Sequence, residues 1–224
     1  MATNNLSKIE VEGEDGLVAD CHRMAWPYHE LGSEILDWLL TIGDEEVHGS
    51  VTILRRLEEL VPENPLYPEP IADAVREAER WGDEVFQETA RRMPFAALHF
   101  RPGAMGTFAG GGELDPAGTD FAMAYVRGAW KRLGMTAVSV TEILAGLPAE
   151  IEQIERYAAE GLINGESPTA ADLQIAPSAR ILLNIGDLRP MLEGTAAAGI
   201  AQRFFSDYPG DVPAGAFPES WLPA

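Results

Sequence analysis

Residues 167–176 read Ser-Pro-Thr-Ala-Ala-Asp-Leu-Gln-Ile-Ala and carry the strongest helix-start signal in the chain. The Thr169 hydroxyl can accept a hydrogen bond from the amide of Asp172, and the Asp172 carboxylate can accept one from the amide of Thr169. Apolar side chains then recur at helical spacing through Ile175, Ala179 and Leu182. We therefore expect a buried helix that begins here.

Helical periodicity is also present in the residues before this segment. The spacing of apolar side chains predicts a long helix over residues 71–93. Pro94 would end it, because proline lacks an amide donor. Further helices are expected over about 119–133 and 141–159, and the glycine-rich residues 103–118 are interpreted as a flexible connection.

A proline-rich stretch divides the chain. Residues 61–70 contain four prolines, and neither a helix nor a strand can continue through them. We interpret this stretch as a semi-rigid linker between a domain over residues 1–60 and an all-helical domain over residues 71–224.

The part before the linker has a mixed pattern. Lys8–Glu12 alternates like a half-buried strand. Residues 36–42 and 45–47 could form a hairpin around the Gly43-Asp44 turn. Ser50 could then cap a helix over residues 51–60. A strand, a hairpin and a helix indicate a small α/β unit in front of a helical bundle.

The composition narrows the classes of partner. The chain has 224 residues, and its 36 acidic and 16 basic side chains give a formal net charge of −20. Such a surface repels nucleic acid and anionic membranes, so neither is expected as a partner. The single cysteine, Cys21, cannot form an internal disulfide, and no apolar run approaches the ~20 residues of a membrane span. A cytoplasmic globular protein is expected.

Several motifs, in this order, resemble the glutathione transferase superfamily, and in particular bacterial glutathione-transferase-like proteins. They are the hairpin with its Gly43-Asp44 turn, the helix-opening residues 47–50, the proline-rich linker, and residues 169–172 in an all-helical part. Close counterparts exist for residues 78–84, 172–176, 187–190, 208–210 and 212–215. The resemblance extends from about residue 43 to the C-terminus.

The resemblance implies an α+β protein in which a reduced thioredoxin-like N-terminal domain packs on an all-α C-terminal domain. It implies that the first domain binds glutathione or another low-molecular-weight thiol. It also implies that the second domain binds an apolar small-molecule substrate, and that the protein is a homodimer.

Catalytic candidates come from the same resemblance, because such proteins use Cys, Ser or Tyr near the first helix to stabilise the thiolate. Cys21 and Tyr28 are the residues of these types in the corresponding part of this chain. The alternative for Cys21 is a packed or idle thiol. The alternative for Tyr28, which follows Trp26-Pro27, is a strand entry packed on a core.

Cofactor-binding candidates are Trp38, Gly49 and Ser50. Trp38 stands where the resemblance places a cis-proline that binds the glutathione backbone. Gly49 and Ser50 stand at the helix start that would hold the γ-glutamyl carboxylate, where a helix N-terminus offers unpaired amides and a positive dipole to an anion. The alternative for Ser50 is a simple N-cap.

The candidate substrate pocket is largely aromatic, and its lining residues would be Trp81, Phe86, Arg91, Phe95 and His99. Aromatic residues at helical spacing also form ordinary helix cores, which is the alternative. The histidines lack the spacing of metal ligands, so no metal site is expected. Glu150 and Glu152 are expected on a solvent-exposed helix face.

The sequence thus predicts a glutathione-transferase-like enzyme. It would act on an electrophilic or unsaturated apolar small molecule by thiol transfer or thiol-assisted isomerisation. Because Trp38 replaces the proline and the N-terminal domain is short, two alternatives stay open. One is a non-catalytic descendant that binds a ligand or a protein partner, and the other is a cofactor-free isomerase or cyclase of a specialised pathway.

Overall fold

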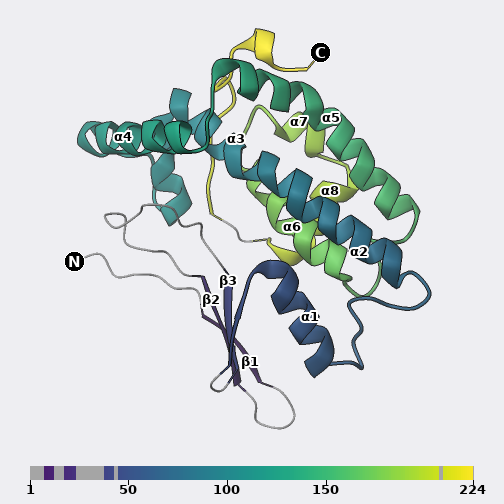
Figure 1. Ribbon diagram of the computed structural model, residues 1–224. Coiled ribbons are helices and arrows are strands. Elements are labelled where there is room, and N and C mark those ends of the chain that lie inside the picture. The colour runs from purple at the N-terminus through teal and green to yellow at the C-terminus, as the bar shows by residue number, and fades with distance from the viewer. Residues whose placement is uncertain (1–7, 13–17, 24–37, 43–44, 207–208, 224) are drawn as a thin grey trace. The chain divides into compact units, whose positions relative to one another are not determined.

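The computed structural model in Figure 1 describes residues 8–12, 18–23, 38–42, 45–206 and 209–223, with side chains from residue 45 onward. The chain divides into two compact units, Met1–Leu66 and Tyr67–Ala224. The division lies inside the proline-rich stretch, residues 61–70. Each unit is described by itself.

The first unit contains an antiparallel sheet with the strand order β1-β2-β3-β4. Its strands are β1 (Lys8–Glu12), β2 (Val18–Arg23), β3 (Trp38–Ile42) and β4 (Glu45–His48). In the register, Cys21 lies opposite Ile9 on one side and Leu40 on the other. The expected strand over Lys8–Glu12 and the expected hairpin, now β3 and β4, are confirmed.

The topology of this sheet differs from a thioredoxin-like one. A strand–helix–strand unit makes a parallel pair, because parallel neighbours need a long crossover connection. Every neighbouring pair among the described strands is antiparallel. The described part of the first unit therefore shows no thioredoxin-like sheet.

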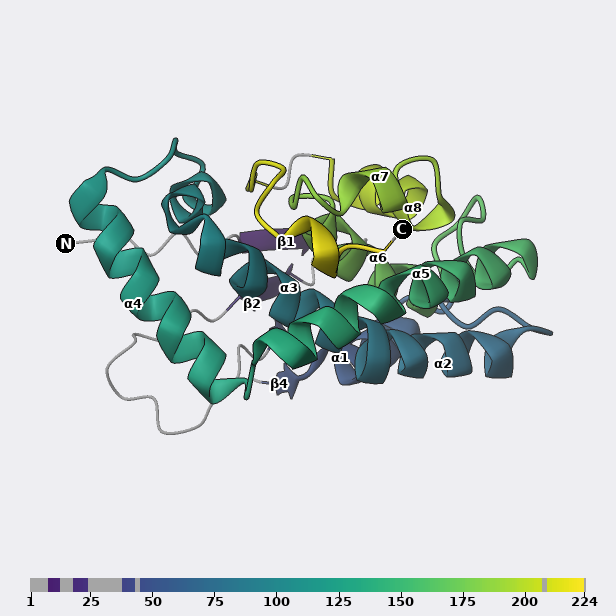
Figure 2. The same cartoon turned by 90° about the horizontal axis from the view of Figure 1, so that it is seen from above.

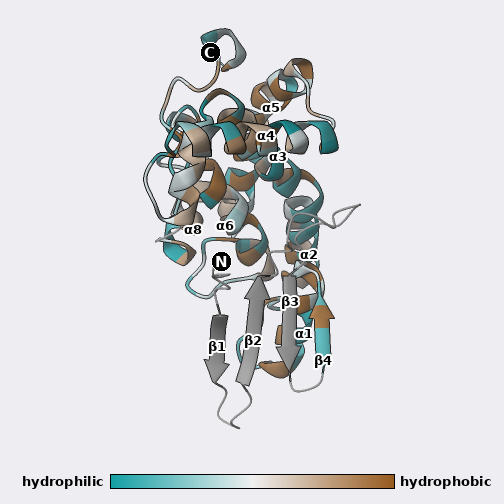
Figure 3. Cartoon of the chain, turned by 90° about the vertical axis from the view of Figure 1, so that its left-hand side faces the viewer, coloured by the Kyte–Doolittle hydropathy of each residue, from teal (hydrophilic) through white to brown (hydrophobic). Residues whose placement is uncertain are grey.

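Helix α1 (Ser50–Leu60) completes the described part of this unit. Strand β4 is hydrophilic in its first part and hydrophobic toward its end (Figure 3), and its one apolar residue, Val47, is buried. Val47 forms a small core with Ile53, and Leu57 and Leu60 pack against it. The amphipathic helix and the short strand thus each bury their apolar side against the other.

The start of α1 corrects one expectation. Gly49 is the N-cap, with φ 84° and ψ 138°, and Ser50 is the first helical residue. A positive φ is uncommon for residues other than glycine, which accounts for glycine at this position. No side chain makes a capping hydrogen bond here, so the interpretation of Ser50 as an N-cap is wrong.

The second unit is mostly helical, as expected. Its α-helices are α2 (Ala72–Trp81), α3 (Gln87–Phe100), α4 (Pro116–Arg132), α5 (Ala137–Ala159), α6 (Ala170–Leu182), α7 (Arg189–Leu192) and α8 (Ala196–Phe204). A π-helical turn, η1 (Gly82–Phe86), joins α2 to α3. One 3-10 helix, η2 (Pro102–Ala109), lies between α3 and α4, and another, η3 (Glu219–Trp221), lies in the C-terminal segment.

Helix α6 is the centre of this unit. It packs against α2, α3 and α8, and Figure 2 shows it between α8 and α2. Its N-terminus has the predicted reciprocal cap, in which the Asp172 amide donates to Thr169 Oγ1 at 3.3 Å and the Thr169 amide donates to Asp172 Oδ2 at 2.9 Å. Asp172 is only 1% exposed. The buried helix predicted from residues 167–176 is confirmed.

The path from α2 to α3 differs from the expectation of one helix ended by Pro94. Pro94 lies inside α3, which continues to Phe100. Proline removes one backbone hydrogen bond, and the packing of α3 against α4, α5 and α6 outweighs this local cost. The π-helical turn begins at Gly82, where a Cβ atom would lie 2.9 Å from Ile175 Cγ1. Gly82 therefore permits the close approach of α6.

The glycine-rich residues 103–118 are more ordered than the expected flexible connection. Most of the first half belongs to η2, and α4 begins at Pro116 after the N-cap Asp115. The Leu114 amide donates to the carbonyl of Gly103 at 2.9 Å, which closes the segment on itself.

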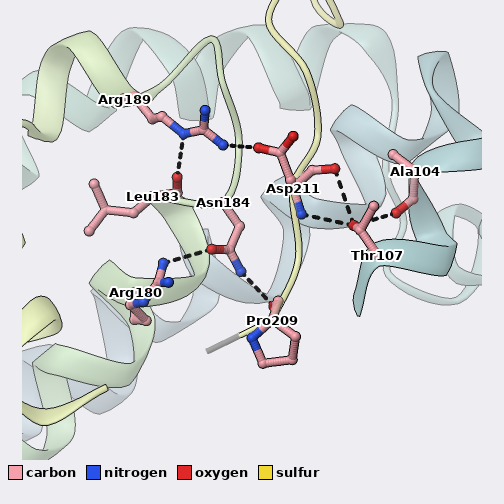
Figure 4. A network of polar contacts seen from close by, with 8 residues as sticks. All are labelled: Ala104, Thr107, Arg180, Leu183, Asn184, Arg189, Pro209 and Asp211. Atoms are coloured by element: carbon pink, nitrogen blue, oxygen red, sulfur yellow. Dashed lines mark hydrogen bonds and ion pairs between the residues drawn. The ribbon is translucent and has the colours of Figure 1, made fainter. Parts of the chain in front are cut away.

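Polar contacts hold the C-terminal segment against the helices (Figure 4). Asn184 Nδ2 donates to the carbonyl of Pro209 at 3.0 Å, and the Asp211 amide donates to Thr107 Oγ1 at 2.8 Å. The Asp211 carboxylate pairs with Arg189. Beyond it, Val212 forms a parallel bridge with Ile185. The C-terminal segment is thus an integral part of the second unit.

Candidate functional site

The structure separates the five residues predicted to line one pocket. Trp81 is the last residue of α2 and Phe86 the last of η1, and their ring centroids lie 5.7 Å apart with an interplanar angle of 11°. Phe95 and His99 lie near the other end of α3. At ~1.5 Å per residue the helical path from Trp81 to His99 spans roughly 27 Å. Arg91, between them, is exposed and donates to Gln87 Oε1 at 3.0 Å.

Phe95 and His99 belong to an aromatic cluster between α3 and α4. The His99 ring lies 4.4 Å from Trp130, and Phe95 contacts Tyr125 edge-on at 6.0 Å. Trp130 Nε1 donates to the Phe95 carbonyl at 2.8 Å. His99 Nδ1 is buried and has no hydrogen-bond partner. This cluster packs α3 against α4, which agrees with the alternative that these aromatic residues form a helix core.

A groove opens beside Trp81, between α2 and the C-terminal half of α5. Its volume is about 480 Å³, within the ~300–1,000 Å³ range of small-molecule sites. It is lined by Ala74, Glu77, Arg80, Trp81, Glu84, Val85, Gln153, Tyr157, Glu160 and Leu162. Of the five predicted pocket residues, Trp81 alone is in this lining.

The aromatic part of the groove is built from two helices. Trp81 ends α2, and Tyr157 lies on α5; their rings meet edge-on at 5.6 Å and 72°. Phe86, fully buried, supports the Trp81 ring from the other side of the junction. Val85 is 41% exposed and adds apolar surface. The site therefore presents a half-buried indole on a rigid support.

The charged part of the groove is predominantly acidic. Glu77, Glu84 and Glu160 contribute three carboxylates, and Arg80 contributes one guanidinium. Desolvation raises the pKa of the Tyr157 hydroxyl, and the negative charges of Glu77 and Glu160 raise it further. The net field in the groove is negative.

Sequence reasoning missed most of this lining, although a signal was present. Glu77, Trp81 and Glu84 are spaced i, i+4, i+7, and so are Gln153, Tyr157 and Glu160. Each triple occupies one side of a helix. A helix side with an aromatic residue between polar ones is a pattern that could have indicated a binding surface on each helix. The sequence could not show that these two helix sides face each other.

A second polar feature lies between α3 and α5, outside the groove lining. Thr89 Oγ1 donates to Glu150 Oε1 at 3.0 Å, and Glu150 Oε2 is buried without a hydrogen-bond partner. Burial raises the pKa of Glu150 from 4.5 to about 7. The expectation that Glu150 lies on a solvent-exposed face is wrong, whereas Glu152 is exposed. Glu150 can therefore gain or lose a proton near neutral pH.

The predicted catalytic and cofactor-binding residues belong to the first unit. The backbone of Cys21 lies in β2 and that of Trp38 in β3, but their side chains lie outside what the structure describes. Tyr28 lies outside the described residues. Gly49 and Ser50 are described, at the N-terminus of α1.

Among the described residues, the first amides of α1 have no backbone or side-chain acceptor. The Ile53 amide donates to the carbonyl of Gly49 at 2.9 Å and so begins the helical ladder. The amides of Ser50, Val51 and Thr52 precede it and have no helical carbonyl to donate to. Because no side chain caps this end, it can offer amides and a hydroxyl to an anion.

The structure also bears on metal binding and on membrane-spanning helices. Across the described ranges, no group of three or more His, Cys, Asp or Glu side chains is placed to hold a metal ion. None of the helices described is both long and apolar enough to cross a bilayer.

Comparison of the chain with known protein families, with curated proteins and with solved structures finds no match.

Proposed function

We propose that the chain is a glutathione-transferase-like enzyme. It would bring a low-molecular-weight thiol to an electrophilic or unsaturated apolar small molecule. In the transfer reaction the thiolate sulfur forms a bond to the electrophilic carbon, and the leaving group departs with its electron pair. In the isomerisation the same carbon–sulfur bond forms and then breaks. The thiol proton passes to solvent as the thiolate forms.

The observation that carries this proposal is the reciprocal cap at the start of α6. Asp172 is nearly fully buried and accepts hydrogen bonds from the amides of Thr169 and Asn164, at 2.9 and 2.7 Å. This segment is one of those on which the sequence resemblance rests, and it organises the helix at the centre of the helical unit. The local geometry supports the resemblance there.

In the first unit, the hairpin β3–β4 followed by α1 is the part that supports a reduced thioredoxin-like domain. Ser50 would hold the γ-glutamyl carboxylate of the thiol, together with the amides of the first turn and the positive helix dipole. Its hydroxyl is not used as a cap, which removes the simplest alternative explanation for a serine at this position. Cys21 or Tyr28 would stabilise the thiolate, and the enzyme would act as a homodimer.

A non-catalytic descendant that binds a ligand or a partner is the second candidate. It is favoured by the all-antiparallel strand pairing of β1, β2 and β3, which leaves the described part of the sheet without a parallel pair. Such a protein would keep the helical unit and lose the thiol site.

Thermal unfolding with and without millimolar glutathione and other small thiols distinguishes the transferase from the non-catalytic binding protein. A thiol present at 100 times its Kd should stabilise the folded chain by ~2.7 kcal/mol, which raises Tm by several degrees. Ser50→Ala should abolish the shift. Ser220→Ala, which removes an exposed hydroxyl from η3 in the second unit, should leave it unchanged.

No shift with any thiol would contradict the transferase proposal and favour the binding protein. Turnover of a substrate without any thiol would instead favour a cofactor-free isomerase or cyclase. A shift that survives Ser50→Ala would keep thiol binding and overturn the role of Ser50.

A further inference from the structure

The groove between α2 and α5 combines an aromatic surface with a negative field. Its volume of about 480 Å³ suits a small molecule, and Trp81 is half-buried in its lining. The groove lies wholly within the second unit, so its chemistry can be argued without reference to the thiol site.

The Trp81 ring is the largest aromatic surface in the groove lining. Phe86 stacks nearly parallel to it and Tyr157 meets it edge-on, so the ring is held by two aromatic neighbours. The guanidinium groups that lie over rings elsewhere in the described chain are Arg76 over Tyr67 and Arg203 over Phe204. Neither of these two covers Trp81. Tryptophan is the aromatic residue that attracts cations best.

Three carboxylates line the same groove as this ring and have no cationic partner among the residues that the structure describes. In the part of the chain that the structure describes, Glu77, Glu84 and Glu160 make no ion pair. Other surface carboxylates do find partners, such as Glu88, which pairs with Arg92 at 2.6 Å. Arg80 is the cation in the lining, so the groove carries two net negative charges.

The ring and the charges select the same ligand. An anion would be repelled by the carboxylates, and a neutral aromatic molecule would gain from contact with Trp81 and Val85 but not from the field. A cation attached to an apolar body gains from both, because its positive charge can lie near the ring and the carboxylates together.

We propose that this groove binds an organic cation, a protonated amine or quaternary ammonium group joined to an aromatic or other apolar body. The apolar body lies against Trp81 and Val85. The ammonium group lies near the carboxylates of Glu77, Glu84 and Glu160. The Tyr157 hydroxyl stays protonated, and its oxygen can accept a hydrogen bond from a protonated amine.

Isothermal titration calorimetry of the full chain with benzyltrimethylammonium tests this site. Benzyl alcohol serves as the neutral probe and benzenesulfonate as the anionic one. Saturable binding is expected for the ammonium, weaker binding for the alcohol and none for the sulfonate. Raising the salt concentration from 50 to 500 mM should weaken ammonium binding, because exposed charges are screened.

Charge variants assign the binding to the groove. Each of Glu77→Gln, Glu84→Gln and Glu160→Gln should weaken ammonium binding by roughly 1.5–5-fold, and Arg80→Gln should strengthen it by a similar factor. Glu142→Gln, which neutralises an exposed glutamate on α5 outside the groove, should have no effect. All five residues are exposed, so the variants are expected to fold, and circular dichroism verifies this.

Trp81→Phe keeps an aromatic ring in the stack and should weaken ammonium binding more than alcohol binding. Equal affinity for the ammonium and the alcohol would overturn the proposal, as would an equal loss in Glu142→Gln and Glu84→Gln. Absence of ammonium binding would overturn it as well. Sedimentation data showing that Glu84→Arg dissociates a dimer would then assign the groove to a second copy of the chain. None of these readouts depends on thiol binding.

Discussion

Thr89 on α3 donates a hydrogen bond to Glu150 on α5 at 3.0 Å, and this contact joins a hydroxyl to a carboxyl group that burial keeps protonated up to about pH 7. The other carboxyl oxygen of Glu150 has no hydrogen-bond partner. A buried carboxylate with one unpartnered oxygen costs more free energy than the neutral, protonated carboxyl. The α3–α5 contact is therefore sensitive to pH.

The pH dependence of stability follows from the sign of this shift. The pKa of Glu150 is about 7 in the folded chain and 4.5 without burial, so the folded state binds the proton more tightly. Its contribution to stability is fully present below about pH 4.5 and is lost as the pH rises through about 7. Glu150→Gln should remove this dependence. At pH 8 the variant should be more stable than the parent by about 1–2 kcal/mol, after allowance for solvent screening.

Urea unfolding at pH 5 and pH 8 measures this difference, and comparison of parent and variant removes the background from the net charge of −20. Glu142→Gln, which changes an exposed glutamate on the same helix, is the control. It should keep the parental change in unfolding free energy between pH 5 and pH 8. If the unfolding free energy of Glu150→Gln changed between pH 5 and pH 8 as much as that of the parent, a buried, protonated carboxyl at this position would be contradicted.

Two glycines should respond to alanine with opposite signs. At Gly186 a Cβ atom would lie 2.4 Å from the Ala214 amide nitrogen, so Gly186→Ala forces the C-terminal segment away and should cost about 1–3 kcal/mol. At Gly128, in α4, no heavy atom lies within 4 Å, and Gly128→Ala should stabilise by about 0.5–1 kcal/mol. Thermal unfolding of both variants checks the prediction. A loss of stability in both would mean that the response does not follow the space around each glycine.

The attachment of the C-terminal segment depends on Asn184, which is 2% exposed. Its Oδ1 accepts from Arg180 Nη1 at 2.7 Å, and its Nδ2 donates to the Pro209 carbonyl at 3.0 Å. Asn184→Ala should cost about 1–3 kcal/mol, because the Arg180 guanidinium and the Pro209 carbonyl both lose a hydrogen bond to a buried side chain. Amide hydrogen exchange should accelerate at Val212, whose amide donates to the Asn184 carbonyl.

Asn64→Ala removes an exposed asparagine from the proline-rich stretch and should change neither stability nor exchange at Val212. If Asn184→Ala also leaves exchange at Val212 unchanged, the segment must be held by Arg189, Asp211 and Thr107 without help from Asn184.

The parts of the fold that the sequence predicted rest on local rules. The cap of α6 joins residues three positions apart, so Thr169 and Asp172 sufficed to predict it. Pro94 shows the limit of such rules. The rule that proline ends a helix failed because packing of α3 against its neighbours maintains the helix to Phe100.

The candidate groove depends on contacts between distant parts of the chain. Trp81 was predicted as a pocket residue, but Tyr157, which meets its ring, was not. The burial of Glu150 is of the same kind, because a glutamate on a helix is normally exposed and only the approach of α3 makes this one an exception. The sequence carries the residue types of the site, and tertiary packing determines which of them meet.

The buried carboxylate of Asp172 should be the most sensitive acidic side chain of the helical unit. It accepts hydrogen bonds from the amides of Asn164 and Thr169 and from the Thr169 hydroxyl, at 2.7, 2.9 and 3.2 Å. Asp172→Ala leaves the Thr169 and Asn164 amides without this acceptor and should destabilise the fold by about 2–4 kcal/mol in urea unfolding.

Asp115 provides a matched comparison, because it caps α4 from an exposed position by accepting from the Gly118 amide at 2.7 Å. Asp115→Ala should cost only about 0.5–2 kcal/mol, since water can replace the lost acceptor. The excess cost at Asp172 measures what the burial of its carboxylate adds to the cap. Equal costs for the two variants would mean that the α6 cap contributes no more than an exposed one, and the central role of this segment in the fold would have to be abandoned.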